Sequence, residues 1–114
     1  MAEERPYYFD KNDLGRFGEI GRVNKELGDK YFEYYGKAMA AGALSEREKA
    51  LIALAVSHAL RCPYCIDAYS RACLEKGADE QQMNEAVHVA AAMSAGIVLV
   101  HGVQMMNHTK KIMM

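Results

Sequence analysis

Two cysteines spaced for redox chemistry lie in the middle of the chain, in the tetrapeptide Cys62-Pro63-Tyr64-Cys65. Pro63 suits the first turn of a helix, where a missing N–H costs nothing, so the motif predicts a helix that begins beside Cys62. Unpaired amides at a helix N-terminus stabilise a thiolate, and the spacing places a second thiol within one turn. One sulfur can then attack a peroxide or a disulfide while the other resolves the product. Zinc binding and inert packing are the other interpretations of such a pair.

A zinc site at this pair would need two further ligands, and the sequence has no second Cys-x-x-Cys and no His-x₃₋₅-His pair to supply them. Cys73 follows Cys62 by 11 residues, or about 16 Å along a helix, which is too far to share a metal or form a disulfide with it. We expect Cys73 to be a packed apolar thiol. No metal and no cofactor is predicted, although a dithiol could bind a soft metal or metalloid ion.

Two further side chains are candidates for serving the thiols as acid or base. His58 lies one turn before Cys62 and carries an imidazole, the side chain that most often acts as a base, but a histidine at a helix end also caps carbonyl groups. Tyr69 shares the helical face of both cysteines and can donate a hydrogen bond to a thiolate or a peroxide oxygen, while a core aromatic role fits equally well. The candidate catalytic residues are therefore Cys62, Cys65, Tyr69 and His58.

The elements that must position these groups are all predicted to be helical. Apolar residues recur at helical spacing from position 10 to 41 and predict two helices with a break at Gly28. Ser45 and Glu48 form a capping box that opens a helix through KALIALAVSHAL. Because this Ala/Leu-rich helix, and not a strand, precedes the cysteine motif, the thioredoxin fold is excluded. We predict an all-α domain of five or six helices.

The remaining helices are marked by their ends. The motif helix should run from about Cys62 to Lys76 and stop at Gly77 in a left-handed conformation. Asp79 with Gln82 then caps a last helix. It carries an uncharged stretch, residues 86–108, that is long enough to span a membrane.

That stretch contains several polar residues and lacks flanking aromatic anchors, so we predict no membrane insertion. A helix that is apolar nearly all round in so small a protein is more typical of packing between subunits. His88 and His101 lie on this helix and could approach the dithiol, although a core or interface role is the more common one.

Composition limits the class of protein. The 114 residues carry 14 Lys+Arg against 15 Asp+Glu and are 51% hydrophobic, which indicates one globular domain, residues 1–114, with a core at about 10–106. The near-zero net charge gives no reason to expect nucleic acid or a membrane as partner. A charged start without an apolar export segment favours the cytoplasm. A chain of this length buries a marginal core, so a homo-oligomer is expected.

The run LSEREKALIALAVSHALRCPYCIDAY, followed by the apolar AAAMSAGIVLVHGVQM, resembles the carboxymuconolactone decarboxylase/alkylhydroperoxidase D superfamily over residues 44 to about 105. It looks closest to the arsenosugar-biosynthesis-associated peroxidase-like subgroup. The resemblance implies an all-α domain that assembles as trimers or hexamers, and a hydroperoxide or disulfide substrate reduced at the expense of an external dithiol. It further implies that Cys65 attacks the peroxide and Cys62 resolves the product to a disulfide.

The chain departs from that family's proton relay at two positions. The peroxidase branch has a Glu twelve residues before the first Cys and a His four residues after the second, where this chain has Ala50 and Tyr69. Another group, with His58 the first candidate, must then accept the thiol proton. These departures keep open the alternative of a non-catalytic dithiol module that binds a soft metal or metalloid. The name of the superfamily keeps open a second alternative, a carboxymuconolactone decarboxylase.

Overall fold

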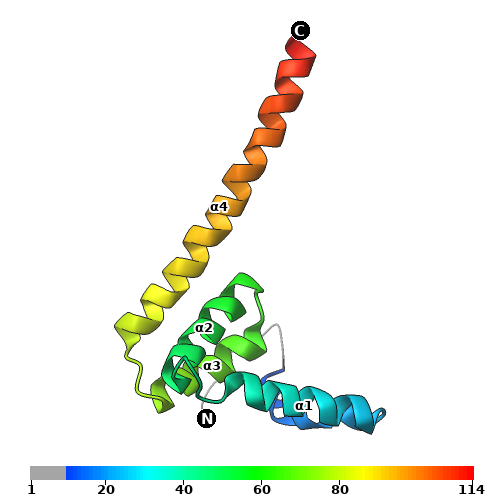
Figure 1. Cartoon of the computed structure of the whole chain (residues 1–114), viewed down its shortest axis with the longest axis vertical. Helices are drawn as coiled ribbons and strands as arrows, with labels where there is room; N and C mark the ends of the chain where they lie inside the picture. Colours follow the sequence, from blue (N-terminus) through cyan, green and yellow to red (C-terminus); the bar gives the residue numbers. More distant parts are fainter. Residues whose placement is uncertain (1–9) are drawn as a thin grey trace, which may run out of the picture.

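A computed structural model describes residues 10–114 and places five helices along the chain (Figure 1). In order they are the 3₁₀ helix η1 (Lys11–Gly21) and the α-helices α1 (Lys25–Met39), α2 (Glu46–Ala59), α3 (Pro63–Glu75) and α4 (Glu80–Met113). No strand is present among these residues, so the predicted all-α class is confirmed. Residues 1–9, the charged start on which the expected compartment depended, lie outside the described part of the chain.

The helix ends are set by the local signals that the sequence carries. The Ser45 hydroxyl accepts the Glu48 N–H at 3.1 Å while the Glu48 carboxylate accepts the Ser45 N–H at 2.8 Å, which confirms the predicted capping box. Asp79 and Gln82 form the same reciprocal pair at the start of α4. Gly77 has a φ of 90° and ends the turn after α3, as expected for a residue without a Cβ.

The predicted break at Gly28 is wrong, because Gly28 lies inside α1 and is buried. The chain breaks earlier, between η1 and the Asn24 cap of α1. Gly28 is needed for a close approach, because a Cβ there would clash with the Gly21 Cα, and a Cβ on Gly21 would in turn lie 3.0 Å from the Gly28 Cα. The two glycines therefore let the backbones of η1 and α1 pack directly against each other, a reason that the local sequence pattern does not reveal.

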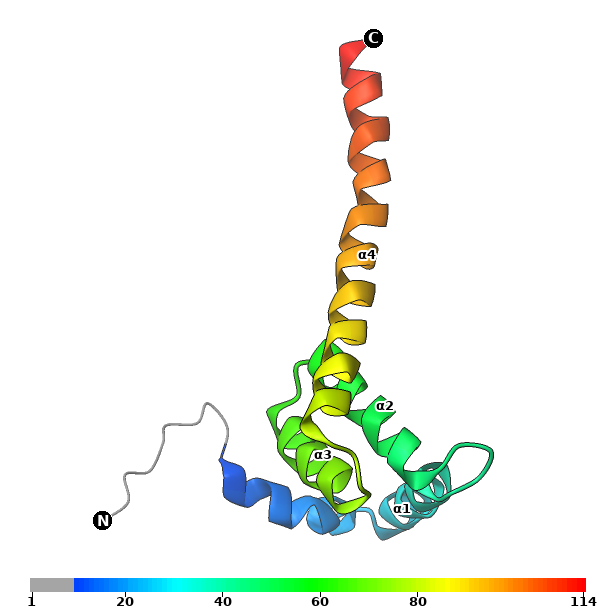
Figure 2. The same ribbon diagram turned by 90° about the vertical axis from the view of Figure 1, so that its left-hand side faces the viewer.

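The core lies between α2 and α3, closed by the α3–α4 turn. Ala50 and Leu54 of α2, Cys73 of α3 and Ala78 of the turn form one buried cluster, and Cys73 has no exposed surface. The prediction that Cys73 is a packed apolar thiol is thereby confirmed. Both η1 and α1 cross the base of this pair (Figure 2).

Lys49 joins α1 to α2. Its ammonium group donates hydrogen bonds to the carbonyl oxygens of Ala38 at 2.8 Å and of Ala40 at 2.5 Å. These carbonyls lie at the C-terminal end of α1, where the helix dipole favours a positive charge. This contact fixes the end of α1 beside the start of α2.

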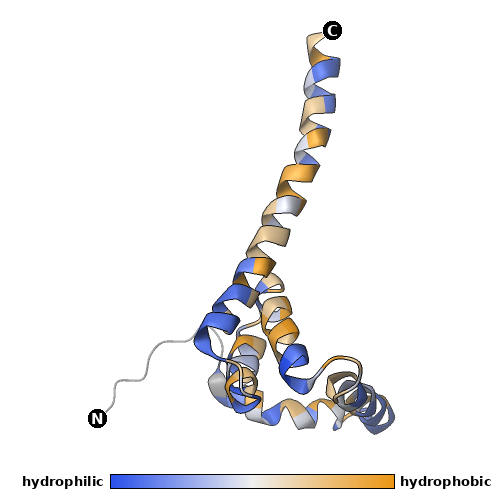
Figure 3. Ribbon diagram, turned by 60° about the vertical axis from the view of Figure 1, so that its left-hand side comes forward, coloured by the Kyte–Doolittle hydropathy of each residue, from blue (hydrophilic) through white to orange (hydrophobic). Residues whose placement is uncertain are grey.

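The helix α4 packs its first turns against α2 and then rises away from the other helices (Figures 1 and 2). The radius of gyration is 19.1 Å, against about 13 Å for a globular chain of this length, because much of α4 projects. Its projecting part is largely apolar (Figure 3), and Leu99, for example, is 75% exposed. By length and composition alone this helix could cross a membrane.

Candidate dithiol site

The turn between α2 and α3 places the cysteine pair. Arg61 has a φ of 56°, a left-handed conformation that reverses the chain immediately before Cys62. The Cys62 N–H then donates to the carbonyl oxygen of Ser57 at 2.9 Å, and the buried Ser57 hydroxyl donates to the carbonyl of Leu54 at 2.7 Å. These bonds tie the first residue of the motif to the last turns of α2.

Cys62 is the N-cap of α3 and Pro63 its first residue, as predicted. Both cysteines are free thiols, each half-buried, and their sulfur atoms lie 2.6 Å apart. The Cys65 backbone N–H also donates to the Cys62 sulfur at 3.3 Å. Since a disulfide bond is about 2.05 Å long, oxidation of this pair needs only a small movement of the two side chains.

The electrostatics of the two thiols are coupled. Desolvation by burial, followed by the hydrogen bond to Cys62 and the negative charge of Cys62, raises the pKa of Cys65 to about 11. At neutral pH Cys65 is therefore a thiol and not a thiolate. Attack by its sulfur requires that a nearby group take the proton as the reaction proceeds.

His58 lies on the last turn of α2, and its Nδ1 is 2.8 Å from the carbonyl oxygen of Leu54. A carbonyl only accepts, so Nδ1 carries the proton and donates it, and Nε2 is the basic nitrogen of the neutral ring. Within residues 10–114 this histidine forms no hydrogen bond with either thiol. The hydrogen bond of His58 therefore lies within α2, and its role as base remains a prediction.

Tyr69 follows Cys65 by one turn on α3 and is half-buried against the core cluster. The core role is therefore confirmed, because the ring packs against this cluster, whereas a role of the Tyr69 hydroxyl toward the thiols stays a prediction. His88 and His101 are both exposed on α4. Among the described residues, no group of three or more His, Cys, Asp or Glu side chains is arranged to hold a metal ion.

Sequence reasoning missed Tyr35, which belongs to the surroundings of the dithiol. Its ring is half-buried on α1, beside Tyr31 and Phe17, with ring centroids 5.9 Å and 6.3 Å away. Burial, then the charges of Tyr31 and Cys65, raise the pKa of the Tyr35 hydroxyl. Aromatic residues at helical spacing on α1 are visible in the sequence, but nothing local shows that they face α3.

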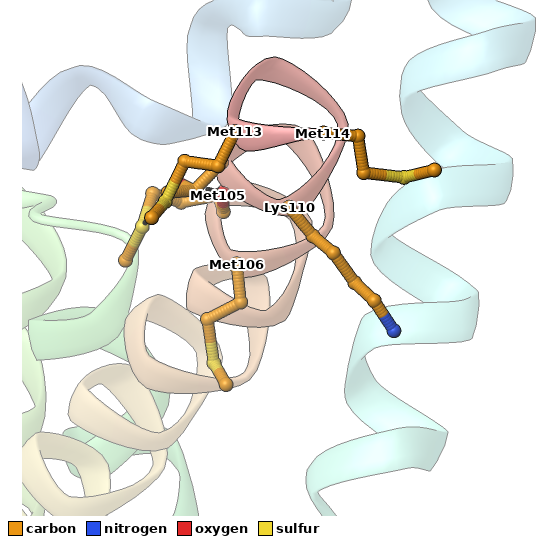
Figure 4. Close-up of a pocket in the computed structure, with 6 residues that line it drawn as sticks. Met105, Met106, Lys110, Met113 and Met114 are labelled. Atoms are coloured by element: carbon orange, nitrogen blue, oxygen red, sulfur yellow. Dashed lines mark hydrogen bonds between the residues drawn. The ribbon is translucent and has the colours of Figure 1, made fainter.

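The helix η1 also contacts the Cys62–Cys65 motif. The Tyr64 hydroxyl donates to the Asp13 carboxylate at 3.4 Å across 51 positions of sequence. By contrast, the pocket near the C-terminus is lined only by residues of the last turns of α4 and by Met114, which follows it (Figure 4). It lies along one exposed helix, so its methionines take no part in the dithiol site.

Comparisons with known proteins identify one family and two similar proteins. The sequence profile of the carboxymuconolactone decarboxylase family matches residues 25–107. "Uncharacterized protein 4 in cox locus" of Paracoccus denitrificans is 38% identical over 84 residues, which cover 74% of this chain and 76% of that protein. A structural-genomics crystal structure of a protein from Methanobacterium thermoautotrophicum superposes with a TM-score of 0.70 at 31% identity, covering 74% of this chain and 94% of that one.

Proposed function

The chain belongs to the carboxymuconolactone decarboxylase family, within the alkylhydroperoxidase D-like superfamily, and on this premise we propose that it is a dithiol oxidoreductase that reduces organic hydroperoxides. The observation that carries the proposal is the apposition of two free thiols, 2.6 Å apart, at the first turn of α3. A decarboxylase has no use for such a pair. A peroxidase needs one sulfur to attack and a second to resolve.

The proposed reaction proceeds in two steps. The Cys65 sulfur attacks the terminal oxygen of the hydroperoxide, so that an S–O bond forms, the O–O bond breaks and the alcohol leaves with the proton of Cys65. The Cys62 sulfur then attacks the sulfenic acid, so that the S–S bond forms, the S–O bond breaks and water leaves with the proton of Cys62. An external dithiol returns two electrons and two protons and restores the free pair.

The raised pKa of Cys65 sets the proton requirement of the first step. His58 offers Nε2 as a base, because its Nδ1 is held by the Leu54 carbonyl. Rotation of the ring about χ2 would be needed to use Nδ1 instead. Tyr69 is suited to donating a hydrogen bond to the leaving oxygen, because a phenol is a good hydrogen-bond donor and a poor base at neutral pH.

The test is the intact mass of the reduced protein, followed for seconds after addition of one equivalent of an organic hydroperoxide. The unmodified protein should lose two hydrogens and two alkylatable thiols, with Cys73 still reduced. Cys62→Ser should stop at the sulfenic acid, a gain of one oxygen on Cys65. Cys65→Ser should lose the reaction, and Cys73→Ala is the matched control that keeps it. Oxidation of Cys65→Ser at the rate of the unmodified protein would overturn the assignment.

We also propose that the projecting part of α4 is covered by a second copy of this chain. The exposed apolar residues there are continuous over several turns (Figure 3), and a soluble monomer rarely leaves such a surface open. Light scattering on the purified protein should give an oligomeric mass, and Leu99→Glu should lower it. A monomer that sediments with membranes until detergent is added would instead favour a bilayer around α4.

A further inference from the structure

A cleft of about 350 Å³ lies between the end of α1, the start of α2 and the second half of α3. None of the chemistry described so far uses it. Its walls come from three helices and consist of Tyr35, Gly36, Met39, Ala40, Glu46, Ala50, Ala72 and Lys76. Lys49 of α2 fixes its shape, because this residue holds the carbonyl groups at the end of α1. A cleft of this size is within the range of small-molecule sites.

The α3 residues that line the cleft lie on the same face of the helix as Cys65. Cys65, Tyr69, Ala72 and Lys76 follow one another at intervals of four, three and four residues and therefore share one face of the helix. From Cys65 to Ala72 the rise along the axis is about 10 Å. Tyr35 connects the cleft with the dithiol, because it lines the cleft and lies close enough to Cys65 for a thiolate there to raise the pKa of its hydroxyl.

The walls are apolar where they approach the dithiol and charged at the far end. Met39, Ala50 and Ala72 offer methyl, methylene and thioether groups, and methionine adapts its shape to a flexible ligand. At the far end Lys76 and Glu46 form an ion pair of 2.6 Å, each 46% exposed at the side chain. Because these two charges satisfy each other, the cleft has no charged group left to bind an ionic ligand in its apolar part.

Ala50 makes this space possible. It is 3% exposed in the core cluster and also borders the cleft, so any larger side chain there would grow into the cleft or into the core. The methyl group of Ala50 therefore gives the cleft an apolar wall.

We propose that this cleft binds the alkyl chain of an organic hydroperoxide whose O–O group lies at Cys65. The proposal rests on the proposed peroxidase function and specifies its substrate as a hydroperoxide with an unbranched apolar chain several methylenes long. A hydroperoxide whose O–O group lies at Cys65 must extend about 10 Å along α3 to enter the cleft. Small hydroperoxides are too short for this, so the cleft should not affect their reaction with Cys65.

Two hydroperoxides that differ only in chain length test this. The rate of Cys62–Cys65 disulfide formation is measured by quenching with an alkylating reagent and determining the intact mass of the protein. It should be about tenfold higher with n-octyl than with ethyl hydroperoxide, because burial of about two methylene groups stabilises the bound state by the corresponding free energy. Gly36→Leu and Ala72→Leu, which fill the cleft from two different helices, should abolish the preference and leave the ethyl rate within twofold. Gly36→Ala is the matched control, because a Cβ there meets no described atom within 4 Å.

Equal rates with both hydroperoxides in the unmodified protein, or an equal loss of both rates in the filled variants, would overturn the cleft assignment. If neither hydroperoxide oxidises the protein, the proposed function is refuted. The cleft assignment is then tested by a binding measurement that does not depend on oxidation. In that measurement 1-octanol is added to the reduced protein, and the methyl NMR signals of Met39 and Ala72 should shift in the unmodified protein and not in Gly36→Leu. Unshifted signals in the unmodified protein would refute the cleft independently of the peroxide chemistry.

Discussion

Removing the sulfur of Cys62 should make Cys65 more reactive toward an alkylating reagent. Two of the three causes that raise the pKa of Cys65 to about 11 come from Cys62, namely its hydrogen bond and its charge. Both Cys62→Ser and Cys62→Ala eliminate the charge, and neither restores solvent to Cys65. The pKa of Cys65 should therefore fall in both variants, and desolvation should keep it above its usual range.

The size of the effect follows from the difference between the ordinary pKa of a cysteine thiol, 9.0, and the pKa of Cys65, about 11. A complete return would raise the thiolate fraction at pH 8 about a hundredfold, from roughly 0.1% to roughly 10%. The less basic thiolate is also a weaker nucleophile, by about eightfold over two units for a Brønsted coefficient near 0.45. The net gain is then about tenfold at most, and since desolvation remains we expect about three- to tenfold.

The assay is the initial rate of iodoacetamide labelling of Cys65 as a function of pH, measured on the peptide that contains it. Cys73 serves as the internal control, because burial alone raises its pKa and its labelling should stay slow in every variant. Faster labelling of Cys73 would report unfolding. If Cys65 titrates in both variants as it does in the unmodified protein, then the charge of Cys62 does not act on it, and the coupling of the pair is refuted.

Three further predictions concern stability. Gly28→Ala should lower the free energy of unfolding, measured by urea titration, by about 1–3 kcal/mol, because the new Cβ meets the Gly21 backbone. Gly36→Ala, whose Cβ meets no described atom, should raise this free energy by about 0.5–1 kcal/mol. Equal effects of the two substitutions would contradict the close approach of the backbones at Gly28. Arg61→Gly should stabilise the folded protein by about 1 kcal/mol and raise its Tm, because glycine adopts a φ of 56° without strain. A lower Tm would show that the arginine side chain stabilises the fold by more than the backbone strain destabilises it. Because the pKa of Cys65 is higher in the folded chain, its contribution to stability is complete below about pH 9 and is lost as the pH rises through about 11. In a urea titration at several pH values, Cys65→Ala should flatten this alkaline decline, and an unchanged decline would show that another group causes it.

What the sequence by itself determines about this protein is local. The capping boxes at Ser45 and Asp79, the left-handed Gly77 and the helix that begins at Cys62 all depend on bonds between residues two to four positions apart. Side chains at such spacing meet whenever the helix forms, whatever the rest of the chain does. For the same reason the position of the dithiol, and the apolar character of α4, could be predicted without coordinates.

Only the tertiary structure decides which helices meet. Gly28 looks like a helix break in the sequence and proves to be a point of backbone contact with Gly21. Tyr35, thirty positions before Cys65, lies on another helix, and the cleft beside it is bounded by three helices. Such contacts depend on how helices cross, and crossing is set by the packing of whole faces, which no short stretch of sequence encodes. The position of the two thiols is therefore visible in the sequence, and the cleft that we propose for their substrate is created only by the packing of α1 against α2 and α3.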